Sequence, residues 1–189
     1  VVRLAEEMGA IDTDPVLRAI QINIDYRTAL VGNDPAAREA AAAKALEMMS
    51  GEEGTSIARR VVIDDHVRSE EWALALSQIE QGLEANPKDR QLYLIRLGLF
   101  EKLGRTSEIE AQLKEMISLF PEDATPTQML IGMLLSQGRT DDAEVFLRSL
   151  IDPKVDGHEA QMQVVSFILA RKGPEAAIAE LDELISAGG

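Results

Sequence analysis

The stretch RQLYLIRLGLFEKLGRTSEIEAQLKEMISLFPED, residues 90–123, decides the fold. It holds two runs of helix-forming residues, separated by Gly104 and closed by Pro121. In the first run Leu97 and Phe100 lie three residues apart, so both lie on one face of a helix. Glycine and proline at such places end helices. The stretch therefore predicts a helix, a turn at Gly104 and a second helix that ends before Pro121.

The pattern returns every 34 residues along most of the chain. Gly104 is followed at that spacing by Gly138, and Pro87 is followed by Pro121. Apolar residues recur in the same frame, with three exceptions in twenty-four positions, of which His66 is one. The columns include Ile63, Leu97, Ile131, Val165; His66, Phe100, Leu134, Ile168; and Ile79, Leu113, Leu147, Leu181. The columns predict that Phe100 and Leu147 are deeply buried. One helix pair cannot bury both of its apolar faces, so neighbouring pairs must stack into a solenoid.

The frame divides the chain into two regions. We predict four repeats, at residues 56–89, 90–123, 124–157 and 158–189. Residues 1–55 fit the frame poorly and are predicted to form a degenerate N-terminal helical repeat region, continuous with the four repeats as one solenoid. In that region we expect helices at residues 1–8, 15–30 and 35–49, which makes roughly ten helices in the chain.

The helix starts carry signals of their own. Asp or Thr directly before Pro is typical of a helix N-terminus, because the side-chain oxygen accepts from a first-turn amide and proline at the first position has no amide to satisfy. This pattern occurs at Asp14, Asp34 and Thr125. Ser107 and Asp156, each with an acid three residues later, are typical of a capping box. We therefore predict N-caps at these five residues.

The repeat resembles the tetratricopeptide family, whose repeats are 34 residues long. That family has a large residue near repeat position 4, an aromatic at 11 and proline at 32, where the second copy has Tyr93, Phe100 and Pro121. At position 8 the family usually has glycine, whereas this chain has larger side chains, Leu97 among them. The resemblance implies an all-α fold, a right-handed superhelical solenoid of antiparallel helix pairs, in a bacterial protein. Related solenoids of helix pairs are the alternative.

The composition argues against several function classes. The formal net charge of -14 repels phosphate backbones and anionic lipid, so we expect no nucleic-acid partner. No apolar run is long enough to span a bilayer, so we expect no membrane insertion. There is no cysteine, which removes thiolate chemistry and disulfides but leaves bacterial cytoplasm and periplasm equally open. The chain begins at Val1 rather than Met, so we expect a processed chain or a fragment.

No motif for catalysis stands out. His66 and His158 do not have metal-ligand spacing, and the glycines form no phosphate-binding loop. The acidic pairs at residues 70–71 and 141–142 are predicted in first helical turns, where carboxylates favour the helix dipole. We therefore expect no enzyme activity, no cofactor and no metal, and a scaffold that binds a protein or peptide partner. The alternative is an accessory domain of a larger protein, possibly thioredoxin-like or another enzyme.

The resemblance also implies where a partner binds. In tetratricopeptide arrays the first helix of each pair lines a concave groove, which here receives an apolar peptide or an amphipathic helix. The candidate groove residues are Arg60, Asp64, Leu94, Gly98, Gly132, Leu135, Met162 and Leu169. The same residues alternatively pack against adjacent first helices. Family adaptors that grip a terminal carboxylate use Lys, Arg and Asn, and the matching positions here, such as Asp64 and Gly98, predict that this clamp is absent.

The last helix carries a second apolar stripe. Ile178 and Ile185 lie seven residues apart, so they share a face that would meet a following repeat. Solenoid ends need a polar outer face for solubility. We therefore expect an end contact at these two residues, with further chain or with a second copy in a homo-oligomer. The alternative is that neighbouring side chains fold over them.

Overall fold

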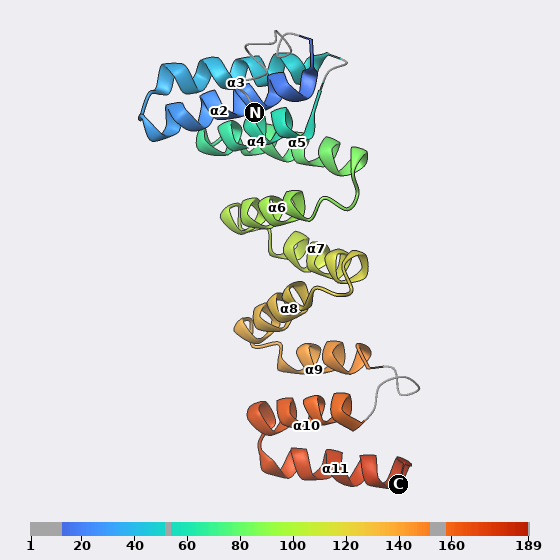
Figure 1. Cartoon of the computed structure of the whole chain (residues 1–189). Coiled ribbons are helices and arrows are strands. Elements are labelled where there is room, and N and C mark those ends of the chain that lie inside the picture. Colours follow the sequence, from blue (N-terminus) through green and yellow to red (C-terminus); the bar gives the residue numbers. More distant parts are fainter. Residues whose placement is uncertain (1–12, 52–53, 152–157, 189) are drawn as a thin grey trace. The chain divides into compact units, whose positions relative to one another are not determined.

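The computed structural model describes residues 13–51, 54–151 and 158–188 (Figure 1). These residues form ten helices and no strand. The helices are α2 (Pro15–Val31), α3 (Pro35–Ser50), α4 (Ser56–Arg68), α5 (Trp72–Ala85), α6 (Arg90–Lys102), α7 (Thr106–Leu119), α8 (Ala124–Ser136), α9 (Thr140–Ser149), α10 (His158–Lys172) and α11 (Pro174–Gly188). The all-α helical fold is confirmed. The helix expected at residues 1–8 lies outside the described residues.

From α4 onward the helices begin at a regular spacing. Each first helix of a pair, and each second helix, begins 34 residues after its counterpart in the pair before. Gly104 and Gly138 separate the helices of two pairs with positive φ values of 66° and 73°. Glycine adopts this backbone conformation without the steric cost that a Cβ brings. Local sequence therefore sets both the length of each helix and the turn that follows it.

Contacts divide the chain into two compact units, Val1–Thr106 and Ser107–Gly189. In unit 1, α4 packs against α2, α3 and α5, and α5 packs against α6. The first core cluster includes Tyr26, Ala41, Ala45 and Ala58, all nearly inaccessible to solvent. Alanine at the contacts brings α2, α3 and α4 close together, because interhelical distance depends on the side chains between the axes. Phe100 on α6 is buried, as predicted.

In unit 2, α9 packs against α8 and α10, and α10 packs against α11. The core is formed by Val164, Val165, Ile168 and Ala177. Leu147 lies at its edge and is only partly buried, so the prediction of deep burial was wrong for this residue. Leu147 lies in the last turn of α9, a short helix that ends at Ser149, so it packs only against the edge of this core.

Within unit 2, ion pairs join the second helices of successive pairs, or the residue that caps such a helix. Arg148 on α9 donates from Nη1 to Glu180 Oε1 on α11 at 2.6 Å. Glu110 on α7 accepts from Arg139 Nη1 at 2.7 Å and from Lys114 Nζ at 2.8 Å. These two hydrogen bonds, Arg139 contributing most, lower the pKa of Glu110 to about 2. The carboxylate is therefore charged throughout the physiological range.

Two of the five predicted N-caps are confirmed, and Asp156 lies outside the described residues. Asp14 and Asp34 accept first-turn amides at the starts of α2 and α3. Thr125 is not a cap, because α8 begins one residue earlier and Asp123 accepts the Thr125 amide at 3.0 Å. Ser107 also lies inside its helix, since α7 begins at Thr106. In both cases the helix starts earlier than the Ser/Thr signal indicated, and in α8 the reason is a carboxylate ahead of the Thr.

The two acidic pairs differ in their positions. Asp141 and Asp142 lie in the first turn of α9, as predicted. Glu70 and Glu71 precede α5 instead, and Glu70 has a positive φ of 60° in the turn before the helix. Glu71 Oε2 lies 2.6 Å from Nδ1 of His66. Its carboxylate is thus directed back toward α4 and not over the amides of α5.

Candidate partner-binding groove

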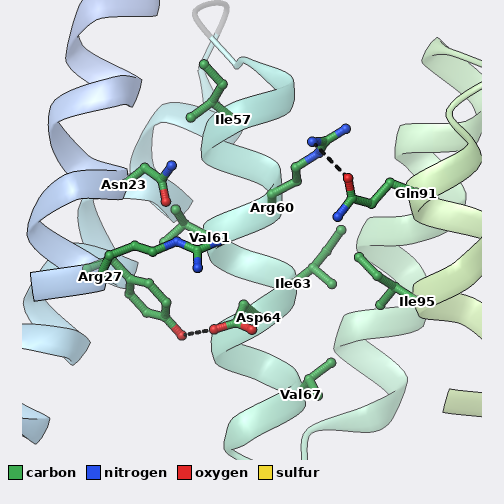
Figure 2. A pocket seen from close by; sticks show the side chains of 11 residues that line it. Asn23, Arg27, Ile57, Arg60, Val61, Ile63, Asp64, Val67, Gln91 and Ile95 are labelled. Atoms are coloured by element: carbon green, nitrogen blue, oxygen red, sulfur yellow. Dashed lines mark hydrogen bonds between the residues drawn. The ribbon is translucent and has the colours of Figure 1, made fainter. Parts of the chain in front are cut away.

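A pocket of about 400 Å³ lies in unit 1 between α2, α4 and α6, the helices that come first in their pairs (Figure 2). It is lined by Asn23, Tyr26, Arg27, Ile57, Arg60, Val61, Ile63, Asp64, Val67, Gln91 and Ile95. The helix α4 supplies more than half of this lining. Its contribution combines aliphatic side chains with two charged ones, so the pocket has an apolar floor and polar walls.

Asp64 is held by two donors. The Tyr26 hydroxyl donates to Asp64 Oδ2 at 2.8 Å, and Arg68 Nε donates to the same oxygen at 2.7 Å. Burial, followed by the hydrogen bond to Asp64, raises the pKa of Tyr26, so this phenol stays protonated and remains a donor. The carboxylate of Asp64 is therefore offset by Arg68 and fixed against α2.

Arg60 is held in a comparable way at the other wall. Its Nη2 lies 3.1 Å from Asp89 Oδ2, and its Nη1 lies 3.5 Å from Gln91 Oε1. Asp89 is also the N-cap of α6, where Oδ1 accepts the Gln91 amide at 3.1 Å. Arg60 thus joins α4 to the start of α6, and much of its charge is offset by Asp89.

Arg27 differs from both. It is exposed, and it makes no hydrogen bond or ion pair with any residue of the described ranges. Figure 2 shows its side chain extending from α2 toward Val61 on α4, with Asn23 one turn earlier on the same helix. The 34-residue frame indicates neither residue, because α2 lies outside that frame. The signal present in the sequence was their spacing of four, which places Asn23 and Arg27 on one helix face.

The predicted groove residues fall into both units. In unit 1, Arg60 and Asp64 line the pocket, while Leu94 and Gly98 lie on exposed positions of α6. In unit 2, Gly132 and Leu135 lie on α8, and Met162 and Leu169 on α10. Leu94, Met162 and Leu169 are exposed, whereas Leu135 is half-buried. No described atom lies within 4 Å of the place where a Cβ of Gly98 or Gly132 would be, so both glycines leave open surface. That these residues bind a partner stays a prediction.

The stripe on α11 is open to solvent. Ile178 is 58% exposed and Ile185 is 70% exposed. Described side chains of the same unit therefore leave both residues accessible, although Leu181 and Leu184 beside them are partly buried in the core.

None of the described helices has the length and apolarity that a membrane crossing requires. Within the same residues, no group of three or more His, Cys, Asp or Glu side chains is arranged to hold a metal ion.

The comparisons with known proteins bear on the fold. No protein-family model matches the chain, and no curated protein matches it. A chain in the solved structure of Naa15/Naa10 bound to HypK-THB is similar, with a TM-score of 0.53 and 18% sequence identity. The likeness covers 96% of this chain but 30% of that one, so the chain spans less than a third of the length of the protein it matches. At this identity the likeness shows the fold alone. The chain has a TPR-like helical-repeat fold.

Proposed function

We propose that this chain is a tetratricopeptide-type scaffold that binds a peptide or a helix of a partner protein, without catalytic activity of its own. The observation that carries the proposal is the pocket between the first helices α2, α4 and α6. Concave sites with an apolar lining and a few oriented polar groups are typical of ligand-binding surfaces.

The exposed apolar residues on first helices support the same reading. Leu94 on α6, and Met162 and Leu169 on α10, are large side chains that folding leaves accessible. Glycines without neighbours, Gly98 and Gly132, leave space for a backbone or a side chain of a partner. An amphipathic helix laid on such a surface would bury its own apolar stripe against these residues.

The proposal is tested by capture of partners on the immobilised chain, with each unit mutated separately. Leu94→Glu and Met162→Glu place a charge on a first helix of unit 1 and of unit 2. Leu74→Glu and Val145→Glu are matched controls, because both residues are exposed apolar side chains on second helices. We expect Leu94→Glu or Met162→Glu to reduce capture roughly tenfold or more, as at interface hot spots, and the controls to leave it unchanged. If Leu74→Glu or Val145→Glu reduces capture instead, the binding site lies on the second helices.

A further inference from the structure

The charges that line the unit 1 pocket are unequally matched. Asp64 is offset by Arg68, and Arg60 is offset by Asp89. Arg27 has no such partner among the described residues, so the pocket keeps one uncompensated cation in a chain whose net charge is -14. A guanidinium presents donors in a planar fork that fits a carboxylate.

The pocket is long enough to hold several residues of a ligand, and not only one carboxylate. Its apolar floor runs along α4 from Ile57 to Val67, a distance of about 15 Å at the rise of an α-helix. Arg27 stands on the α2 wall beside this floor, and the amide of Asn23 lies one turn away (Figure 2). A ligand that uses all of these features carries aliphatic side chains along the floor and one anionic group at the wall.

We propose that the pocket binds an apolar segment of a partner protein through an internal Asp or Glu side chain that pairs with Arg27. This inference rests on the proposed function and specifies the chemistry of the partner. The segment's aliphatic side chains cover the half-buried Ile57 and Val67, and its carboxylate accepts hydrogen bonds from Arg27 and Asn23. Arg27 is thereby the residue that determines specificity for an acid.

The negative charge of the chain as a whole opposes an acidic ligand only at long range. At physiological ionic strength the screening length is about 8 Å, so most of the acidic surface is screened from the pocket. A hydrogen bond to a charged group is among the stronger ones, and its loss costs about tenfold in affinity or more. The local pairing with Arg27 therefore outweighs the distant repulsion.

The experiment is selection of a random peptide library on the immobilised full chain, with internal peptides whose C-termini are fused to the display carrier. Wild type is compared with Arg27→Glu and with Lys44→Glu, which makes the same change in charge at an exposed position on α3, away from the pocket. Thermal unfolding by circular dichroism verifies that all three are folded. We expect wild type and Lys44→Glu to enrich peptides with an Asp or Glu beside aliphatic residues, and Arg27→Glu to lose that preference.

A selected peptide is then synthesised with an amidated C-terminus, alone and with its acid replaced by the amide. We expect the amidated peptide to bind wild type as before and the Glu→Gln or Asp→Asn peptide to bind about tenfold more weakly, with no such difference on Arg27→Glu. Acid enrichment that survives Arg27→Glu, or enrichment of basic peptides on wild type, would overturn the inference. The same peptide is also made with a free C-terminus. If only that form binds, the carboxylate that pairs with Arg27 is the chain end, and this result would overturn the inference too. Enrichment of no peptide above the bare support would refute the proposed function itself.

Discussion

Replacing Gly82 by alanine adds one methyl group where three helices meet. Gly82 lies within α5 and is buried between Arg59 of α4 and Leu92 of α6. A Cβ at this position would lie 2.5 Å from Leu92 Cδ1 and 2.9 Å from Arg59 Cδ. Carbon atoms prefer separations of about 3.5–4.0 Å, so at least one neighbour must move.

Neither neighbour moves freely. Leu92 is 3% exposed and is enclosed by the core. Arg59 is tied to α5, because its Nη1 donates to the Gln78 carbonyl at 3.2 Å and to Gln78 Oε1 at 3.1 Å. Overpacking of this kind costs about 1–3 kcal/mol. Alanine gains about 0.5–1 kcal/mol over glycine in a helix interior. We therefore expect Gly82→Ala to lower the free energy of unfolding by up to about 2.5 kcal/mol.

Gly98→Ala is the matched control. Gly98 also lies inside a helix, α6, but no described atom is within 4 Å of its Cβ position. The substitution keeps the gain in helix propensity without the clash, so we expect it to raise the free energy of unfolding by about 0.5–1 kcal/mol. The two Gly→Ala changes should thus have opposite signs.

The assay is urea unfolding followed by the fluorescence of Trp72, which is the single tryptophan of the chain and lies in unit 1 with both glycines. Midpoints are compared at equal slope, so that a change in midpoint reports stability. If the urea midpoint of Gly82→Ala equals that of Gly98→Ala, the close approach of α5 to α4 and α6 is refuted. In a Leu92→Ala background Cδ1 is gone, and the cost of Gly82→Ala should shrink by about 1 kcal/mol in a double-mutant cycle.

Three further predictions concern the rest of the chain. The folded pKa of Glu110 is about 2, below its ordinary value of 4.5, so its contribution to stability is present above pH 4.5 and is lost as the pH falls toward 2. Glu110→Gln should flatten the pH dependence of thermal unfolding in that window, and an unchanged acid limb would contradict the assignment. Phe100→Ala should cost about 3 kcal/mol or more, whereas Leu147→Ala at the edge of its core should cost below about 2 kcal/mol; equal costs would show that their burial is misassigned. If α11 contacts a second copy, light scattering should find wild type heavier than Ile178→Glu/Ile185→Glu, since each covered isoleucine contributes at most about 1.5–3 kcal/mol. A wild type that stays monomeric at high concentration would remove support for that contact.

The sequence alone determined the local structure. The spacing of Gly104 and Gly138 fixed where helix pairs turn, and the apolar columns placed Phe100 in the core. Asp14 and Asp34 marked two helix starts correctly. These features depend on neighbours within a few residues, because backbone conformation, capping and the apolar face of a helix are decided within one or two turns.

Only the tertiary structure decided which side chains share the pocket. Residues 15–31 lie outside the repeat frame, so nothing in the periodicity placed Asn23 and Arg27 beside Arg60. Their meeting depends on how closely α2 approaches α4, and small residues such as Ala19 on α2 and Ala58 on α4 lie in the core that these helices share. The frame likewise could not tell that Leu147 stops at the edge of its core. Helix periodicity predicts which face of a helix is buried. Which other helix covers that face depends on packing contacts across many residues, and these are seen only in the tertiary structure.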